Sequence, residues 1–206
     1  MEAAVKSLPS KLQNVMKGYE IFTARTADDL INHHRNRMDL AVTDPDTRNG
    51  FRSHYAVTDV EGHSQAFVEW IKSPFENRYV HFSEQMNARG TAAHEAEHAN
   101  DAALGKPSQN DPEFDRLYRQ EANKVLSGTR DLSDLGWLDY YIRANNGSDG
   151  QIELNAPPGK TELFAELAAV AVTGETSSKN VTAQDLVAYF PETYKYVRSK
   201  IQSGEW

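Results

Sequence analysis

Apolar residues recur at helical spacing through much of the second half of the chain. Between residues 111 and 127 they fall every three or four positions, which predicts an amphipathic helix with Asp111 as its cap and Pro112 in its first turn. Its expected core residues are Phe114, Leu117, Tyr118, Ala122 and Val125. Periodicity, caps and breaks together predict further helices at residues 26–40, 91–105, 132–144, 161–172, 182–190 and 191–201.

The first half of the chain contains short runs typical of strands. Aromatic and β-branched residues bounded by turn residues predict strands at 19–24, 53–60, 65–72 and 78–82, and later at 151–154. Because the strands come mostly before the helices, we expect an α+β fold, with a small mixed or antiparallel sheet and a mainly helical half. We expect one domain over residues 1–206, with the sheet in 19–90 and the helices in 91–206. Residues 1–18, broken by Pro9, are expected to form a mobile lead-in.

The composition excludes several classes of protein. The 206 residues carry a formal net charge of −8, which argues against a nucleic-acid partner and favours a cationic one. No stretch approaches the ~20 apolar residues of a membrane span, and the first residues do not resemble an ordinary signal peptide. The chain has no cysteine, so any bound metal must be held by His, Asp and Glu side chains.

The helix predicted at residues 91–105 carries the pattern H-E-x-x-H. His94 and His98 lie one turn apart on one face, so both rings can reach a single metal ion. Glu95 follows the first histidine, where its carboxylate can act on a water without binding the metal. The alternative is a solvated face of His and Glu residues. For the other histidines we expect surface or packing roles at His33 and His34, and positions in the sheet at His54, His63 and His81.

A catalytic zinc site needs a third protein ligand beside two histidines and a water. Glu162 and Glu166 lie one turn apart on the helix predicted at residues 161–172. Glu162 is the expected third ligand, and Glu166 is expected to accept the remaining ring N–H of a metal-bound histidine. Three aspartates are alternative ligands, the first of them in a Gly-Thr-x-Asp string: Asp131, Asp101 and Asp115.

Two segments, in this order, resemble the anthrax lethal factor-like zinc metallopeptidases, which are gluzincins: His94-Glu-Ala-Glu-His98-Ala-Asn-Asp101 and Glu162-Leu-Phe-Ala-Glu166. The resemblance covers about residues 91–202. The interval between the two segments is longer than in that family. The family also has a tyrosine shortly before the glutamate ligand, and residues 155–160 contain none. Tyr140 and Tyr141 are the nearest upstream substitutes, and either can equally be a core aromatic residue.

The resemblance implies a zincin-like domain with zinc as its cofactor. It implies three zinc ligands, which are His94, His98 and Glu162. It also implies that Glu95 is the general base and that Glu166 supports a ligand from behind, a role in which we also place Asp101. Finally, it implies a secreted or host-delivered bacterial toxin or effector that cuts a host protein; without that role, the protein is expected in the cytoplasm.

The expected chemistry is hydrolysis of a peptide bond in a protein or peptide substrate. Tyr141 is our candidate donor to the oxyanion. The substrate is expected to pair with an edge strand, with residues 78–82 as the candidate, and a basic segment would suit the acidic surface. Two alternatives remain: a zinc hydrolase acting on a non-peptide bond, and a non-catalytic interaction protein with an incidental H-E-x-x-H. The substrate, secretion route and oligomeric state are left open.

Overall fold

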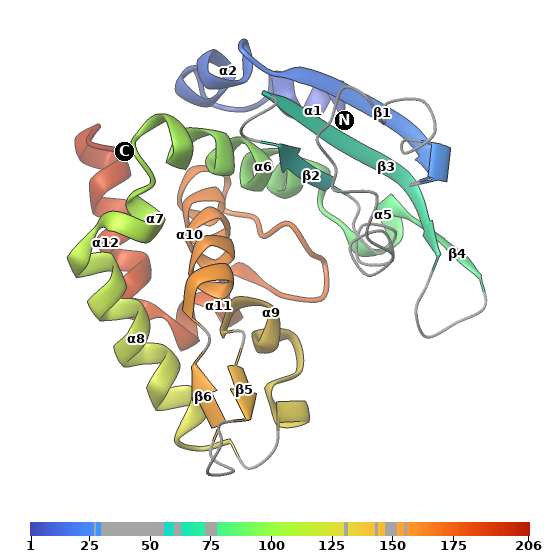
Figure 1. Ribbon diagram of the computed structural model, residues 1–206. Coiled ribbons are helices and arrows are strands. Elements are labelled where there is room, and N and C mark those ends of the chain that lie inside the picture. The colour runs from blue at the N-terminus through green and yellow to red at the C-terminus, as the bar shows by residue number, and fades with distance from the viewer. Residues whose placement is uncertain are drawn as a thin grey trace.

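The structure is a computed structural model that describes residues 1–26, 28–29, 56–59, 63–72, 78–129, 132–142, 144–146, 152–154 and 156–206. It combines a small sheet with a larger helical part (Figure 1). The expected α+β class, with a small mixed sheet and a mainly helical second half, is therefore confirmed. In the part of the chain that is described, no helix is both long enough and apolar enough to cross a membrane.

The main sheet is built around β3 (Ser64–Lys72). β1 (Glu20–Thr26) pairs with β3 in parallel, with Glu20 opposite Ser64. On the other side, β2 (Ala56–Asp59) pairs antiparallel with the first half of β3, and β4 (Tyr79–His81) with its last residues. The mixed pairing brings β2 beside the helix that carries the H-E-x-x-H pattern.

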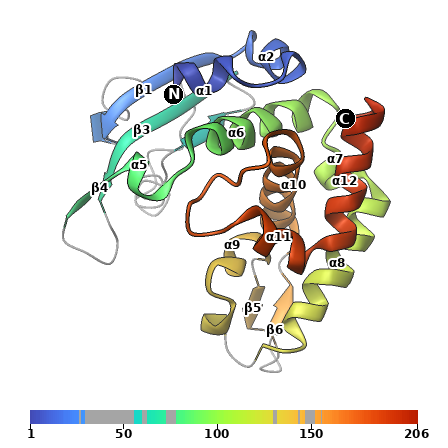
Figure 2. The ribbon, with the colours of Figure 1, turned by 180° about the vertical axis from the view of Figure 1, so that it is seen from behind.

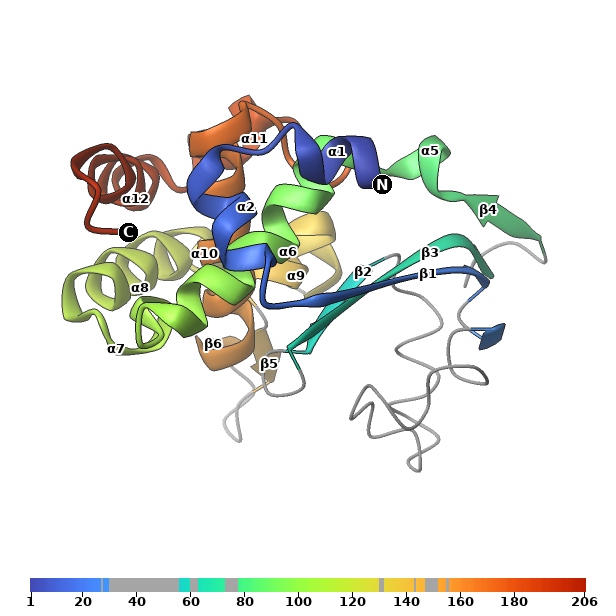
Figure 3. The same ribbon diagram turned by 90° about the horizontal axis from the view of Figure 1, so that it is seen from above.

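That helix is α6 (Ala88–Ala103), which ends at Leu104 with Gly105 in the left-handed conformation. Its small alanine side chains allow two short helices, α1 (Glu2–Lys6) and α2 (Ser10–Met16), to pack closely against it (Figure 3). One core cluster joins α2 and α6 to α10 through Leu8, Leu12, Met16, Ala92, Ala93, Ala96 and Ala169, and Ala4 and Val5 of α1 pack against it. Leu8, Leu12 and Met16 are thus packed into the core, which differs from the mobile lead-in that we expected.

The helical part surrounds α10 (Ala156–Thr173), which contacts α6 and α12 (Pro191–Ser203) (Figure 2). α8 (Pro112–Leu126) and α11 (Ala183–Tyr189) complete this layer. The large core cluster contains Phe114, Tyr118 and Ala122, as the apolar pattern predicted, together with Leu163, Leu167 and Phe190. Leu163 and Leu167 are fully buried, so the face of α10 next to its two glutamates is fixed in the core.

Local signals in the sequence set several helix ends correctly. The side chain of Asp111 accepts hydrogen bonds from the backbone N–H groups of Glu113 and Phe114 at the start of α8. Thr182 caps α11 in the same way. Thr26 and Asp29 cap each other reciprocally at the end of β1.

The helix predicted over residues 132–144 is wrong. The chain forms a 3-10 segment, η1 (Leu132–Leu138), then one turn of α9 (Asp139–Ile142) and then β5 (Ala144–Asn146). Gly136 breaks the helix because it adopts φ 53°, which other residues rarely do. β5 pairs with β6 (Ile152–Leu154), a strand that was predicted.

Three further differences concern the helices, namely one earlier start and two helices that were not predicted. α10 begins at Ala156, several residues before the predicted start, because Pro157 and Pro158 are accommodated in its first turn. Two one-turn helices were not predicted, α5 (Phe82–Gln85) and α7 (Pro107–Asn110). Several predictions lie outside the described residues: the helix beyond Asp29, parts of the strand at 53–60, and the roles of His33, His34, His54 and Asp131.

Candidate metal centre

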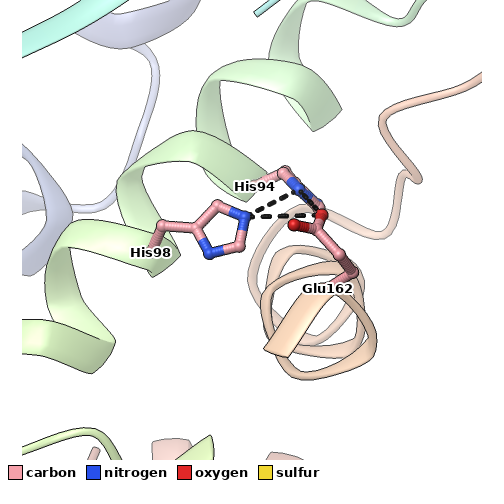
Figure 4. A group of neighbouring side chains, drawn as sticks. All are labelled: His94, His98 and Glu162. Atoms are coloured by element: carbon pink, nitrogen blue, oxygen red, sulfur yellow. Dashed lines mark hydrogen bonds and ion pairs between the residues drawn. The ribbon is translucent and has the colours of Figure 1, made fainter. Parts of the chain in front are cut away.

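α6 presents its two histidines toward α10. His94 and His98 lie one turn apart, and their rings meet edge to face with centroids 4.7 Å apart. Glu162 reaches toward them from the first half of α10 (Figure 4). The structure therefore brings together the three side chains that were expected to share a metal, although 63 residues separate His98 from Glu162.

The three potential ligand atoms form a nearly equilateral triangle. The two Nε2 atoms lie 3.1 Å apart, and Oε2 of Glu162 lies 3.3 Å from Nε2 of His94 and 3.6 Å from Nε2 of His98. A tetrahedral zinc ion with ligands at about 2.0–2.1 Å separates its ligand atoms by roughly 3.3 Å. The residues present therefore fit a tetrahedral ion of this size, and two nitrogen donors with one carboxylate are a donor set that zinc accepts.

The group is closed on one side and open on the other. The His94 side chain is 6% exposed, whereas the side chains of His98 and Glu162 are 15% and 24% exposed. A metal bound here would be held from the protein side and reached by solvent beside Glu162. That difference matches a catalytic site, which keeps one position for water or substrate, better than a structural site closed by four protein ligands.

Glu166 holds the ring of His94 from behind. Nδ1 of His94 lies 2.6 Å from Oε2 of Glu166, so the ring N–H at Nδ1 donates to the carboxylate, and a neutral ring in this tautomer would offer the Nε2 lone pair to a metal. The Glu166 carboxylate is fully buried and also accepts from the backbone N–H of Ser177 at 2.6 Å and from its hydroxyl at 2.8 Å. Glu166 therefore occupies the place predicted for it.

The charges of the site favour a carboxylate beside two imidazoles. Burial alone would raise the pKa of Glu162, but hydrogen bonding and charge from His94 and His98 outweigh it and hold that pKa far below its usual range. Burial would likewise lower the pKa of His94, but the charges of Glu166 and Glu162 raise it well above the ordinary value. Glu162 and Glu166 thus place negative charge beside His94, and a divalent cation at this position would be stabilised by the same charge.

Glu95 is buried between α6 and the sheet. The hydroxyl of Thr58 on β2 donates to Oε2 of Glu95 at 2.6 Å, and the side-chain amide of Gln65 donates to the Glu95 backbone carbonyl at 2.8 Å. These contacts connect the acid of the motif to β2 and β3. Neither Thr58 nor Gln65 was singled out in the sequence, because nothing local relates residues 58 and 65 to residue 95.

Of the two candidate tyrosines, Tyr140 is the one that contacts Glu162. Its hydroxyl donates to Oε2 of Glu162 at 2.7 Å. Burial and the neighbouring charge of Glu162 raise the pKa of Tyr140 well above its usual value, so the hydroxyl keeps its proton. Tyr141 is a buried core residue whose hydroxyl lies near Glu166, and its pKa is raised chiefly by burial. The sequence prediction preferred Tyr141, whereas the contact to the ligand group is made by Tyr140.

The other acids and histidines have separate partners. Both carboxylate oxygens of Asp101 accept from Ser108, through its backbone N–H and its hydroxyl, and this fixes the turn after α6. Asp101 is near enough to His98 for the charges to interact, but its hydrogen bonds serve the turn. Asp115 pairs with Lys160 at 2.6 Å. His81 caps α5 and His63 packs on a tyrosine ring, as expected of residues outside the site.

Ser177 was also missed by the sequence reading. It lies in the loop after α10, eleven residues beyond Glu166, and no motif marks it. Its contact with Glu166 depends on how that loop folds back. Only a general signal points to such a residue: a buried carboxylate needs more than one donor, so Glu166 requires a partner beside His94.

Comparisons of the chain with protein-family models, with curated proteins and with solved structures find no match.

Proposed function

We propose that this protein is a zinc-dependent endopeptidase with a zincin-like arrangement, in which His94, His98 and Glu162 bind the metal and Glu95 is the general base. The observation that carries the proposal is the triangle of ligand atoms, with sides of 3.1, 3.3 and 3.6 Å, formed by an H-E-x-x-H helix and a glutamate from a second helix. The resemblance to the lethal factor-like gluzincins supports the same assignment.

The metal would supply a Lewis acid that activates water and polarises the carbonyl of the scissile bond. Glu166 keeps His94 in the tautomer that presents Nε2. Glu95 takes the proton from the attacking water and returns it to the leaving amine. Thr58 limits the orientations of that carboxylate through its hydrogen bond.

Tyr140 is the proposed donor to the oxyanion that develops on the carbonyl. It has a protonated hydroxyl beside Glu162, and in the proposed mechanism that hydroxyl donates to the developing oxyanion instead of to the carboxylate. Loss of one such donor typically costs a factor of about 10² to 10³ in kcat. This role replaces the one first given to Tyr141.

The substrate segment is proposed to lie in extended form beside β2. Thr58 on β2 contacts Glu95, whereas β4, the strand first considered, pairs with the far end of β3. Pairing with a strand gives main-chain recognition of a peptide, and the net charge of −8 favours a basic segment. A role as a secreted or host-delivered toxin rests on the family resemblance alone.

The test is cleavage of a peptide library by the zinc-loaded protein, with Glu95→Gln as the control. The proposal expects discrete products with the wild type, none above background with Glu95→Gln, and equal zinc content in both proteins. Zinc uptake without any peptide product would instead indicate a hydrolase for a non-peptide bond. Absence of both zinc and products would leave the interaction-protein alternative.

A further inference from the structure

Glu166 is a fully buried carboxylate that accepts hydrogen bonds from Ser177 as well as from the ring of His94. Ser177 donates to it twice, with the backbone N–H at 2.6 Å from Oε1 and the hydroxyl at 2.8 Å from Oε2. The hydroxyl and the His94 ring N–H thus converge on the same oxygen. A buried carboxylate with well-placed donors has a fixed orientation, and that orientation is passed to the imidazole.

Ser177 is held in place by the beginning of α6. We define residues 174–179, which follow α10, as the strap. The backbone N–H of Asn87 donates to the Ser177 carbonyl at 2.9 Å, and the hydroxyl of Thr91 donates to the same oxygen at 3.2 Å. The strap therefore connects the helix of the third ligand to the helix of the two histidines.

A glycine allows this close approach. A Cβ atom at Gly90 would lie 2.0 Å from the carbonyl oxygen of Thr176, so only glycine fits where the strap crosses α6. The side-chain amide of Asn87 also donates to that Thr176 carbonyl at 3.1 Å. The strap is consequently seated on the first turn of α6, close to His94 along the same helix.

We propose that Ser177 is a positioning residue for the metal centre: it holds the Glu166 carboxylate, which holds the His94 ring with Nε2 directed at the metal position. The inference rests on the proposed metal site and extends it to a residue outside both motifs. Ser177 acts through Glu166 and His94, so it needs no contact with metal or substrate.

The experiment compares Ser177→Ala, Ser177→Thr and wild type. Removing the hydroxyl while keeping the backbone N–H is expected to weaken zinc affinity about tenfold in chelator competition, at the low end of the 10- to 100-fold loss usual for residues behind a ligand. The visible absorption of the Co²⁺-substituted protein is expected to change. Ser177→Thr retains a hydroxyl and is expected to restore both. Ser178→Ala, next in the strap, is the matched control, since the Ser178 hydroxyl accepts from Asn180 instead.

A readout without metal separates this inference from the proposed function. In the metal-free protein, NMR of the His94 Nδ1 proton should show faster exchange with solvent in Ser177→Ala than in the wild type or Ser178→Ala. Equal zinc affinity and equal exchange in Ser177→Ala and wild type would overturn the inference. So would an equal loss in Ser178→Ala, since that would indicate a general effect on the strap. If the wild type took up no zinc, the proposed function would fail while the exchange measurement still decided the role of Ser177.

Discussion

The hydroxyl of Thr58 donates a 2.6 Å hydrogen bond to Oε2 of Glu95, so a side chain from the sheet holds the acid of the H-E-x-x-H motif. The contact joins the two parts of the fold at the residue proposed to move the proton. It gives β2 a role at the candidate site besides the proposed recognition of substrate.

Replacing Thr58 by Val is expected to lower kcat about tenfold, since a hydrogen bond to a charged group is worth about 1.5–3 kcal/mol and part of it orients Glu95. Zinc affinity should stay unchanged, because Thr58 contacts no proposed ligand. Steady-state kinetics and chelator competition measure the two quantities. Thr58→Ser, which keeps the hydroxyl, is the control. Wild-type kcat in Thr58→Val would show that the contact does not serve catalysis.

Leu12→Ala tests whether the N-terminal helices belong to the core. Leu12 is 2% exposed and packs in the cluster that backs α6, so its truncation is expected to lower the free energy of unfolding by about 2–4 kcal/mol. Denaturant unfolding measures the change. Leu104→Ala, at a leucine that is 39% exposed, should change stability far less. If Leu12→Ala lowered stability as little as Leu104→Ala does, the result would support the mobile lead-in that the sequence predicted for residues 1–18.

Gly159→Ala tests the close contact between α10 and α9. A Cβ atom at Gly159 would lie 2.4 Å from the Tyr141 carbonyl oxygen, which is a backbone atom and cannot simply rotate away. We expect a loss of about 1–3 kcal/mol, seen as a lower Tm, although alanine is the better helix former by about 1 kcal/mol. Gly128→Ala, whose Cβ would make an ordinary 3.6 Å contact, should be nearly neutral. A higher Tm in Gly159→Ala than in the wild type would contradict the close approach of α10 to the Tyr141 carbonyl.

The pair of Asp115 and Lys160 predicts a pH dependence. Burial alone would raise the pKa of Asp115, but Lys160 and Arg119 outweigh it and lower that pKa in the folded state. The pair therefore stabilises the fold above the unfolded pKa of about 3.9, and this contribution is lost as the pH falls through the lower folded value.

Asp115→Asn should accordingly cost about 1–3 kcal/mol at pH 7, because Lys160 is buried and would lose its partner. The difference from wild type should shrink when urea unfolding is repeated near pH 3 and below. Glu113→Gln removes an exposed pair with Arg116 on the same helix and should cost far less stability, because solvent screens that pair. A cost for Asp115→Asn that does not change with pH would count against this explanation.

The sequence predicted those features that depend on neighbours along the chain. The caps at Asp111 and Thr182 are set within three residues, and the four-residue spacings on α6 and α10 fix which side chains share a helix face. For the same reason, the sequence could select Glu162 and Glu166 as candidates without knowing how the helices pack. The structure then places Glu162 within 3.6 Å of both histidine Nε2 atoms.

The features that the sequence missed depend on contacts between distant residues. Thr58 and Ser177 reach the site only because β2 and the strap pack against α6. The choice between Tyr140 and Tyr141 depended on the rotation of a single turn that follows the break at Gly136. Residues 1–18 were expected to be mobile because helices as short as these are not stable in isolation. Their stability comes from burial against alanines of α6.

The central claim is that His94, His98 and Glu162 hold one zinc ion, and the most direct test is the zinc content and affinity of Glu162→Ala beside the wild type. Both proteins should be purified without added metal, with Glu192→Ala, at an exposed glutamate on α12, as the control. The account predicts one zinc per chain in the wild type and in Glu192→Ala, and little or none in Glu162→Ala. A wild type without zinc, or a Glu162→Ala protein that binds it as tightly as the wild type, would contradict the claim.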